Sequence, residues 1–390
     1  MPALAARTRT IEPFRVMEVA EHAWHLAAQG RDVIFLLAGE PDFGTPPQAT
    51  AAAQKLAATG RVHYTGSLGI PPLREAIAAM YAERYAVEVP TERIVVTTGA
   101  SAALVLALAA TVDPGREVIV GDPTYPCNRN LISVFDGVPH RVPVGPASDY
   151  QPALSDVRAA WNERTSGVLL ATPANPTGTT VAPAALCTIA DEVAARDGSL
   201  YVDEIYGELV YDIAPSTVLA HTSDAFVVNS FSKTFGMTGW RLGWLVCPDW
   251  ALDAVTRATQ NMYISAPAVA QAAGLACFHP AVWALVEERR REFQRRRDVM
   301  VAGLRALGFS VPVVPRGAFY VWADCADLAA DATVLARHLL DVAGVACTPG
   351  IDFDTATGHR HIRFSYTAPL ARIEEALERM ATALTTSRRA

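Results

Sequence analysis

The sequence lacks three features that would place it in other protein classes: paired cysteines, long apolar runs and an excess of positive charge. Its six cysteines are scattered without a Cys-x-x-Cys pair or a metal-like spacing, so neither a disulfide framework nor a metal site is indicated. No apolar run approaches the roughly 20 residues of a membrane helix, and the N-terminal segment Met-Pro-Ala-Leu-Ala-Ala-Arg-Thr-Arg has no apolar core of signal-peptide length. The net charge of -7 argues against a general affinity for nucleic acid. We therefore expect a reduced, cytoplasmic protein that binds neither nucleic acid nor membranes.

Lysine is nearly absent as well. The chain has two lysines, Lys55 and Lys233, and the rest of its 33 basic residues are arginine. Lys55 lies in Ala-Ala-Ala-Gln-Lys-Leu-Ala-Ala, a pattern typical of a surface helix. Lys233 instead follows the strand-like segment 225–229 and lies among serines, glycines and aromatics. An aldehyde cofactor held as a Schiff base needs an amine, which arginine cannot supply. Lys233 is therefore the candidate for a reactive amine, and a surface loop lysine is the plainer alternative.

The middle of the chain alternates strand-like and helical segments. The strand-like segments are residues 94–98, 117–120, 167–171, 200–203, 226–229 and 242–246, and the helical patterns between them include residues 71–85, 100–111 and 183–196. Strands that alternate with helices of this length predict crossover connections, and therefore an α/β fold with a mostly parallel sheet flanked by helices. Before this region we expect a helix over residues 12–30 and a short strand over residues 32–39.

The C-terminal third has a different pattern. One long helix is expected over residues 280–307. After it come strand-like segments at residues 309–314, 318–322, 345–348 and 361–366, with one further helix between them. This pattern predicts a smaller α+β domain, and a chain of 390 residues is also long for a single core. We predict a large domain over residues 46–285 and a small domain made of both chain ends, residues 1–45 and 286–390.

One fourteen-residue segment carries the most specific motif. Ser230 to Gly243 reads Ser-Phe-Ser-Lys-Thr-Phe-Gly-Met-Thr-Gly-Trp-Arg-Leu-Gly. Ser-x-Ser-Lys followed by Gly-x-Arg-x-Gly resembles the signature of the class I/II aminotransferases, the pyridoxal-phosphate enzymes of the aspartate aminotransferase superfamily and fold type I. In that family the lysine forms the internal aldimine, and the serine and arginine bind the cofactor's phosphate. The resemblance implies these roles for Lys233, Ser230 and Arg241, and a cofactor, pyridoxal 5'-phosphate, bound in the large domain.

Two further motifs match cofactor-binding positions of the family. Thr97-Thr-Gly-Ala-Ser101 lies between a strand and an apolar helix, whose first N–H groups are free to bind an anion. The resemblance places the phosphate loop at Gly99, Ala100 and Ser101, although an ordinary strand-to-helix turn reads the same way. In Tyr201-Val-Asp-Glu-Ile-Tyr206, the resemblance makes Asp203 the anionic partner of the pyridine nitrogen, with Glu204 as the competing candidate.

The remaining matches concern the cofactor ring and the substrate. By resemblance, Asn175 of Asn-Pro-Thr-Gly and Tyr206 donate to the phenolic oxygen, and Tyr125 of Asp-Pro-Thr-Tyr-Pro stacks on the ring. Arg363 matches the arginine that binds the substrate's α-carboxylate, for which its two parallel donors are suited. The backbone of Gly39, in Gly-Glu-Pro-Asp-Phe, helps to hold the same carboxylate, and Asn175 contributes to the substrate site. Cys127 is expected to be a bystander.

The function that the resemblance implies is the transfer of an amino group between an L-amino acid and a 2-oxo acid. Lys233 would carry the α-proton as general base and acid, and Asp203 and Tyr206 would be the other catalytic residues. A carbon–sulfur lyase or related α-carbon chemistry on the same fold is the main alternative. A ligand sensor built on an aminotransferase-like module is a remote one, because such sensors carry a DNA-binding domain before the module and the match begins near residue 12.

The resemblance also implies a homodimer. Val62-His-Tyr-Thr-Gly66 resembles the family segment whose tyrosine, here Tyr64, reaches the phosphate of the neighbouring subunit. A tyrosine in a surface loop of its own subunit is the alternative.

The side chain of the amino donor is predicted from missing cations. Family members that act on aspartate or glutamate supply a second cation from either of two segments, here residues 260–266 and 102–110, and neither contains a basic residue. Because a buried carboxylate without a cation would cost several kcal/mol, we predict a neutral or apolar donor. Candidate pocket walls are Trp24, Tyr263 and Ile264, and the arginines that could still supply a cation are Arg15 and Arg316.

Overall fold

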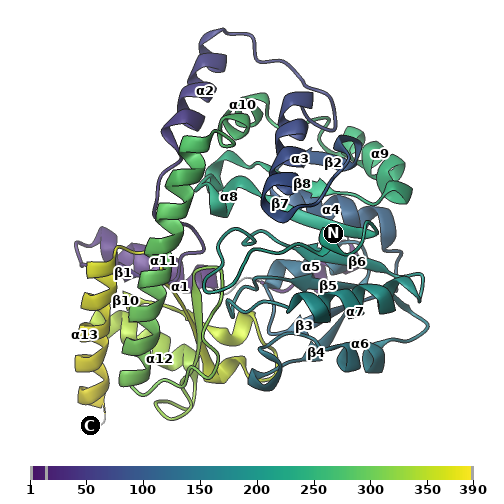
Figure 1. The fold of residues 1–390 in the computed structure, drawn as a ribbon. Coiled ribbons are helices and arrows are strands. Elements are labelled where there is room, and N and C mark those ends of the chain that lie inside the picture. Colours follow the sequence, from purple (N-terminus) through teal and green to yellow (C-terminus); the bar gives the residue numbers. More distant parts are fainter. Residues whose placement is uncertain (1–2, 14–15, 388–390) are drawn as a thin grey trace.

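A seven-stranded sheet forms the centre of the larger part of the molecule (Figure 1). The computed structural model describes residues 3–13 and 16–387. The strands follow the order β2 (Ile94–Thr97), β8 (Gly243–Val246), β7 (Ala225–Ser230), β6 (Ser199–Asp203), β5 (Thr165–Ala171), β3 (Glu117–Asp122) and β4 (Val138–Pro143). The pairs from β7 to β4 are parallel, and β8 is antiparallel to both β7 and β2. The mostly parallel sheet is therefore confirmed, and β4 is a strand that the sequence pattern did not reveal.

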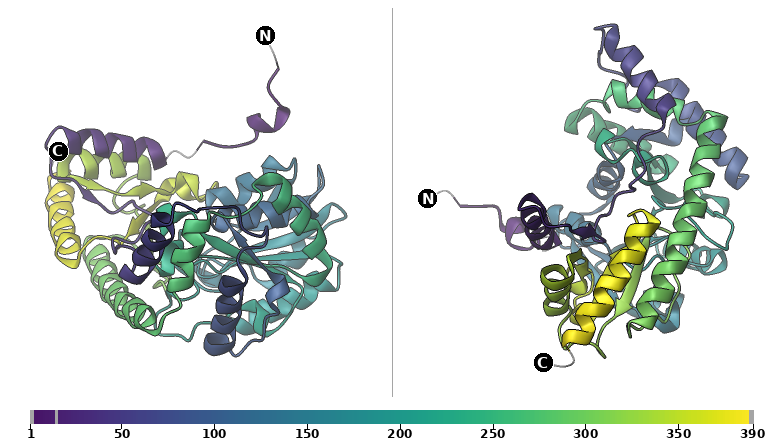
Figure 2. Two further views of the ribbon diagram at one scale, coloured as in Figure 1. Left: turned by 90° about the horizontal axis from the view of Figure 1, so that it is seen from above. Right: turned by 90° about the vertical axis from the view of Figure 1, so that its left-hand side faces the viewer.

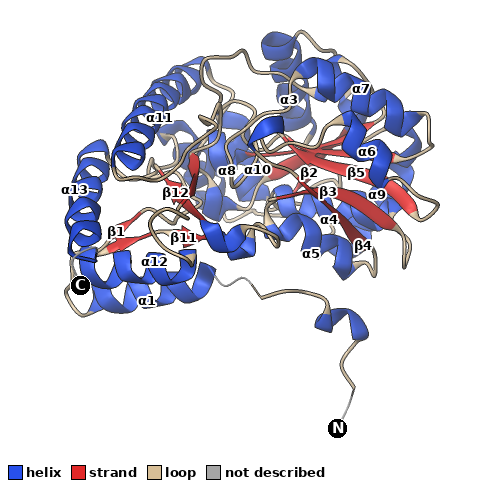
Figure 3. Ribbon diagram, turned by 90° about the horizontal axis from the view of Figure 1, so that it is seen from below, coloured by secondary structure: helices blue, strands red, loops and turns tan. Residues whose placement is uncertain are grey.

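Helices cover both faces of this sheet, as Figure 3 shows. The core on one face includes residues of α2 (Pro47–Ala58), α3 (Pro71–Tyr85), α7 (Pro183–Ala194) and α10 (Ala268–Ala276). The core on the other face is built from α4 (Ala100–Thr111), α5 (Pro126–Val134) and α9 (Leu252–Met262). The short helix α6 (Leu154–Ala160) packs beside α7. Because both faces are covered, the central strands are buried over most of their length, which explains why they appear in the sequence as continuous apolar runs.

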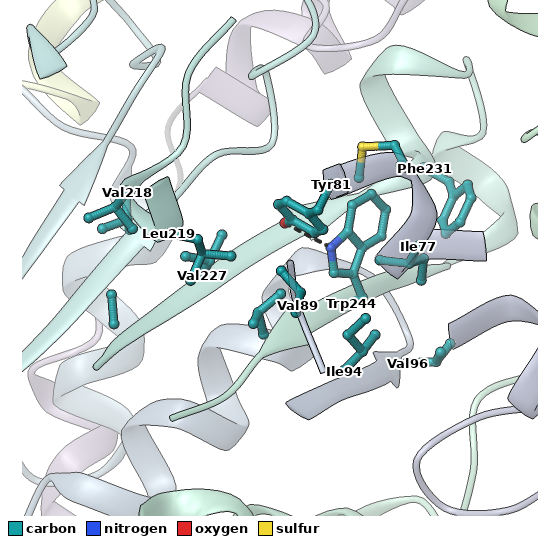
Figure 4. Packing of buried hydrophobic residues seen from close by; sticks show 14 of the residues in the cluster. Ile77, Tyr81, Val89, Ile94, Val96, Val218, Leu219, Val227, Phe231 and Trp244 are labelled. Carbon is teal, nitrogen blue, oxygen red and sulfur yellow. Dashed lines mark hydrogen bonds between the residues drawn. The ribbon is translucent and has the colours of Figure 1, made fainter. Parts of the chain in front are cut away.

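The core of the first face contains one buried polar contact. Tyr81 and Trp244 are enclosed by aliphatic side chains such as Ile77 and Ile94, and the indole Nε1 of Trp244 donates to the hydroxyl of Tyr81 at 3.2 Å (Figure 4). Burial of these two side chains therefore leaves neither of these polar atoms unsatisfied.

A second group of strands forms the smaller part. It contains a three-stranded antiparallel sheet, β11 (Thr348–Pro349), β12 (His361–Ser365) and β9 (Tyr320–Asp324), and a parallel pair, β1 (Ile34–Phe35) and β10 (Val345–Ala346). Its core also holds residues of α11 (Pro280–Ala306), α12 (Ala332–His338) and α13 (Leu370–Ser387). In Figure 1, α11 runs from α10 to lie beside α13, so one long helix spans the two parts. The strands, helices and long connector confirm the expected α/β fold with an added α+β unit, while the domain limits stay a prediction.

One expected strand does not form, and one expected helix starts later than predicted. Residues 309–314 make only an isolated bridge, from Ser310 to Asp324, because Pro312 and Pro315 cannot donate to a ladder. Helix α1 (Val16–Ala28) replaces the helix expected over residues 12–30. Glu12 is not helical, and its carboxylate instead accepts hydrogen bonds from arginines of the larger part.

The first described residues lie against the larger part, although α1 packs with the smaller one. Arg7 forms an ion pair with Asp136, just after α5, and the carboxylate of Glu12 bridges Arg129 and Arg141. Figure 2 shows this segment leaving α1 and running toward the larger part. The N-terminal segment therefore joins the two parts at their edge.

Within the residues that the structure describes, no single helix is long and apolar enough to cross a membrane. Helices α10 and α11 are long and apolar enough only when they are taken together, and an 81° bend separates them.

Candidate active site

Lys233 lies on α8 (Phe231–Thr234), the single helical turn that follows β7. This is the carboxyl end of the parallel strands, where open α/β sheets bind ligands. The side chain is partly buried, and its Nζ donates a hydrogen bond of 2.6 Å to the carbonyl of Gly39. Burial, together with the cations Arg241 and Arg363, lowers the pKa of Lys233 to about 8, against the opposing effect of nearby carboxylates. The amine is therefore more readily neutral, and more nucleophilic, than a surface lysine. Lys55, by contrast, is exposed on α2.

Asp203 ends β6, next to β7 in the sheet. Its carboxylate accepts a hydrogen bond of 3.1 Å from the N–H of Ile205, and no described cation lies within ion-pair distance of it. Burial raises the pKa of Asp203 to about 6, although Lys233 acts in the opposite direction. A carboxylate in such surroundings is stabilised by a positive group that binds beside it. A protonated pyridine nitrogen is a group of this kind.

An anion cradle is formed where α4 begins. Gly99 caps the helix with φ of 97°, and a Cβ at this position would lie 2.5 Å from Nη2 of Arg241. The guanidinium of Arg241 is therefore pressed against the first turn of α4, made by Ala100 and Ser101, where backbone N–H groups are free. Neither an acidic side chain in that turn nor an ion pair to a described residue neutralises this positive region. Such a combination of a helix N-terminus and a cation suits a phosphate.

Ser230, the remaining phosphate-binding candidate, caps α8 and is fully buried. Its hydroxyl is 2.9 Å from both the carbonyl of Leu242 and the hydroxyl of Ser232. The side chain therefore lies at the correct end of β7, but it is engaged within its own turn, so its contact with a phosphate stays a prediction.

Arg363 projects from β12 into the interior and is only 3% exposed. Its Nη1 donates to the side-chain oxygen of Asn175 at 2.9 Å, and its Nη2 donates to the carbonyl of Leu37 at 2.8 Å. The Nε of Arg363 is buried without a hydrogen-bond partner. Because an unsatisfied buried donor on a charged group is costly, it indicates a ligand that accepts from it. A carboxylate meets this requirement.

Two aromatic residues at the site were not predicted from the sequence. The guanidinium of Arg363 lies between the rings of Tyr320 and Phe353, at 4.4 and 4.7 Å from their centroids. The Tyr320 hydroxyl is 3.0 Å from that of Tyr206. In the antiparallel pairing of β9 with β12, Tyr320 lies opposite Ser365, two residues along the ladder from Arg363 and therefore on the same face, so the aromatic pattern of residues 318–322 was the available signal. Phe353 comes from a loop, and no sequence pattern indicated it.

Tyr125 lies immediately before α5 and is partly buried. It packs in a small apolar cluster with Phe353, Trp322 and Tyr150. Tyr206 lies close to Tyr125 and Arg363. Burial and the neighbouring tyrosines hold the pKa of Tyr206 well above its usual value, and Arg363 acts in the opposite direction on both tyrosines. The structure therefore gathers residues of five separate motifs around Lys233 and Arg363. Cys127 is partly buried two residues after Tyr125.

Of the other candidates, Arg316 is joined to the Asn-Pro-Thr-Gly segment, because its backbone N–H donates to the carbonyl of Gly178 at 2.9 Å. Tyr64 is 82% exposed, and Trp24 and Ile264 are about half exposed. Tyr263 is partly buried with an unpartnered hydroxyl, and Arg316 is exposed. Arg15 lies outside the described residues. None of the described members of this set has a hydrogen bond or ion pair with Lys233, Asp203 or Arg363.

The fold and the site together define a class of protein. A partly buried amine, an unpaired carboxylate, an anion cradle and an arginine with an orphan N–H converge at the carboxyl ends of a parallel sheet. Each of these features fits one part of pyridoxal 5'-phosphate or of an amino acid bound to it, so the class is that of pyridoxal-phosphate enzymes with an α/β fold.

Comparison with known proteins gives the family. The family model described as aminotransferase class I and II matches residues 31–380. The chain is 40% identical to the valine–pyruvate aminotransferase of Mycobacterium tuberculosis, over 95% of this chain and 96% of that protein. It is 36% identical to the aspartate/prephenate aminotransferase of Thermus thermophilus, over 98% and 99%. A solved structure of an aminotransferase from Mycobacterium tuberculosis superimposes with a TM-score of 0.95 at 38% identity, covering 99% of this chain and 100% of that one. The chain belongs to the class I and II aminotransferases.

It is therefore an enzyme that depends on pyridoxal phosphate and moves an amino group between an amino acid and a 2-oxo acid.

Proposed function

We propose that Lys233 is the residue that holds the cofactor and moves the substrate's α-proton, and that the preferred amino donor is neutral or apolar. The observation that carries the first part is the partly buried amine on α8, at hydrogen-bond distance from Gly39 and with its pKa lowered to about 8. An amine of this pKa exchanges a proton readily near neutral pH. Lys233 would accept the α-proton of the amino acid and donate it to the carbon of the cofactor's aldehyde group, and with the 2-oxo acid the same amine would move the proton in the opposite direction.

The other cofactor contacts divide by chemistry. When bound, pyridoxal phosphate supplies an electron-withdrawing ring that makes the α-hydrogen of the amino acid acidic. Asp203 keeps a positive charge on the ring nitrogen, Asn175 and Tyr206 donate to the phenolic oxygen, and Tyr125 covers the ring face. The first turn of α4, with Arg241 and Ser230, holds the phosphate.

The substrate's carboxylate is bound by Arg363. The support is its burial and its orphan Nε, with the other two guanidinium nitrogens already fixed by Asn175 and Leu37. A guanidinium that is held before the substrate arrives loses little freedom on binding. The amino acid is thereby oriented relative to Lys233.

The choice of amino donor follows from the charges around these residues. The turn before α10 and the first two turns of α4 carry no basic residue. Arg129, the arginine of α5 that follows Tyr125, is paired with the carboxylate of Glu12 and also donates to the carbonyl of Asp352. In these described segments, a second carboxylate on the substrate would therefore meet no cation that is free of a carboxylate partner. The relative named valine–pyruvate aminotransferase agrees with this proposal, and the one named aspartate/prephenate aminotransferase is the reason to test it.

The test compares kcat/KM for valine, alanine, leucine, methionine, phenylalanine and aspartate with pyruvate and with 2-oxoglutarate as acceptors. We expect aspartate to be poorer than the best neutral donor by at least about 100-fold, because an uncompensated buried charge costs several kcal/mol. Glu12→Gln is the informative variant, since it releases Arg129 from its carboxylate. A wild-type preference for aspartate would contradict the proposal.

We also propose that the enzyme is a homodimer. Four exposed side chains lie on two neighbouring loops or at the end of α9, which leads into one of them: Val62, Tyr64, Met262 and Ile264, which are between 47% and 82% exposed. The loops are joined through the buried Gln271, whose Nε2 donates to Thr65 and to the carbonyl of Ala266, and by the N–H of Thr65, which donates to Ser265. Large apolar side chains held in fixed positions at the surface favour coverage by another chain. Tyr64 is then free to reach the phosphate site of the partner.

A further inference from the structure

Tyr320 contacts both Tyr206, the proposed donor to the cofactor, and Arg363, the proposed carboxylate-binding residue. It lies on β9, is 1% exposed, and its hydroxyl is 3.0 Å from the hydroxyl of Tyr206. Its ring lies 4.4 Å from the guanidinium carbon of Arg363. A Cβ on Gly39 would stand 3.1 Å from the Tyr320 hydroxyl, so this oxygen also lies against the backbone that accepts from Lys233.

The direction of the bond between the two tyrosines follows from their proton count. A tyrosine hydroxyl has one proton to donate. The proposed function requires Tyr206 to donate its one hydrogen bond to the phenolic oxygen of the cofactor. In the hydrogen bond between Tyr206 and Tyr320, the donor must then be Tyr320. A hydroxyl that accepts a hydrogen bond becomes a stronger donor in its own bond. Tyr320 thus strengthens the contact that Tyr206 makes.

The ring of Tyr320 acts at a different place from its hydroxyl. It and the ring of Phe353 both lie against the Arg363 guanidinium, and both rings are buried. Phe353 is itself held by a loop that binds the larger part: its carbonyl accepts from the N–H of Thr124, and the N–H and hydroxyl of Thr355 donate to Asp122. The two ring contacts therefore restrict the movement of the guanidinium whose Nε is free.

We propose that Tyr320 is a positioning residue with two separable roles: its hydroxyl strengthens Tyr206 as a donor to the cofactor, and its ring, with Phe353, holds Arg363 in plane for the substrate's carboxylate. The charged and titratable groups around the Tyr320 hydroxyl include Tyr206, Arg363, Glu40 and Tyr125. Since none of these is removed by changing Tyr320 to phenylalanine, the two roles can be measured independently.

Tyr320→Phe removes the hydroxyl and keeps the ring. A weaker donor at Tyr206 stabilises the ionised phenolic oxygen less, so the pH midpoint at which the visible absorbance of the holoenzyme changes should rise by about 0.3 to 0.5 units. KM for the amino donor should stay within about twofold of wild type. A midpoint equal to that of wild type overturns the role of the hydroxyl.

Phe353→Leu removes one of the two rings that contact Arg363 and leaves the hydrogen bond between the Tyr320 and Tyr206 hydroxyls in place. The lost ring–guanidinium contact should raise KM for the amino donor about 3- to 10-fold with kcat within about twofold, and the absorbance midpoint should not move. Phe353→Met, which keeps more of the side-chain volume, serves if the leucine variant does not fold. An unchanged KM in a folded variant, or a midpoint that moves as far as in Tyr320→Phe, overturns the separation.

The inference about Tyr320 rests on the proposed function of Arg363 as the carboxylate site. The variant Arg363→Lys distinguishes a failure of that proposed function from a failure of the inference. Lysine cannot reproduce the planar fork, so KM should rise by at least about 100-fold. A normal KM in that variant contradicts the proposed carboxylate site itself. A high KM there, with an unmoved midpoint in Tyr320→Phe, contradicts only the inference about Tyr320.

Discussion

At the scale of single residues, the chain has only two lysine side chains that could form a Schiff base, Lys55 and Lys233. Each of its two lysines lies in a surrounding that explains its expected behaviour: Lys55 is exposed on α2, and Lys233 is partly buried with its pKa lowered to about 8. The same burial that lowers the pKa of Lys233 raises that of Asp203 to about 6. The two shifts have one cause, because burial disfavours the charged form of each group.

This contrast predicts that one substitution abolishes the reaction and a matched one does not. Lys233→Ala should lose all transamination and all covalent cofactor trapped by borohydride, because no other amine is available at the site. Lys55→Ala removes the only other lysine and should retain at least about 80% of wild-type activity, since surface substitutions change little. Mass spectrometry of the reduced protein locates the adduct. A trapped adduct on the chain in Lys233→Ala would contradict the assignment.

At the scale of elements, the start of α4 is where backbone geometry and charge combine. Gly99 has a positive φ of 97° and leaves room for Arg241 against the first turn. An ideal Cβ there would come within 2.5 Å of Nη2 of Arg241, and this atom is the end of a flexible side chain. The side chain, rather than the backbone, would therefore give way, and the cradle would lose its cation.

Gly99→Ala should consequently weaken cofactor binding. We expect the dissociation constant for pyridoxal phosphate to rise by at least about 10-fold, because a charged hydrogen bond is worth about 1.5 to 3 kcal/mol. Gly115→Ala is the control, since Gly115 also has a positive φ, of 79°, but no atom lies within 4 Å of its Cβ position. Both variants should lose about 1 to 2 kcal/mol of stability through the left-handed backbone. Equal cofactor affinity in the two would refute the cradle.

At the scale of the whole molecule, the site in one chain lacks the contribution expected from Tyr64. The exposed loops that carry Tyr64 and Ile264 are cross-linked to each other but not to the cradle. Ile264 also has a positive φ of 66°, a rare conformation for a β-branched residue. Strain of this kind persists only where surrounding contacts hold it, so these loops are a rigid surface rather than a loose one.

Mixed dimers test whether Tyr64 acts across the interface. The Lys233→Ala homodimer should be inactive. The Tyr64→Ala homodimer should have reduced activity when the cofactor is limiting. A heterodimer of the two contains one complete site only if Tyr64 serves the partner subunit, and it should then recover about half the wild-type activity. If Tyr64 serves its own subunit, no site in the heterodimer is complete and activity stays at the level of the parents. A fully active monomer in sedimentation would also contradict the proposal.

The sequence by itself determined the chemistry and the type of fold. Lys233 was identified because it is one of two lysines, and the strand–helix alternation predicted the parallel sheet because each element has its own apolar period. Local patterns failed where a partner decided the outcome. Residues 309–314 have an apolar strand pattern, but Pro312 and Pro315 prevent pairing, and β4, with its polar His140 and Arg141, is a strand because it pairs with the buried β3.

Only the tertiary structure placed the partners of Arg363. Tyr320, Phe353, Asn175 and Leu37 come from four distant segments, and what unites them is the packing of β12 against β9 and against the ends of the large sheet. A sequence pattern reports how a residue relates to its near neighbours in the chain. Contacts between separate elements depend on how those elements pack, and that packing decided which aromatic rings contact the guanidinium of Arg363.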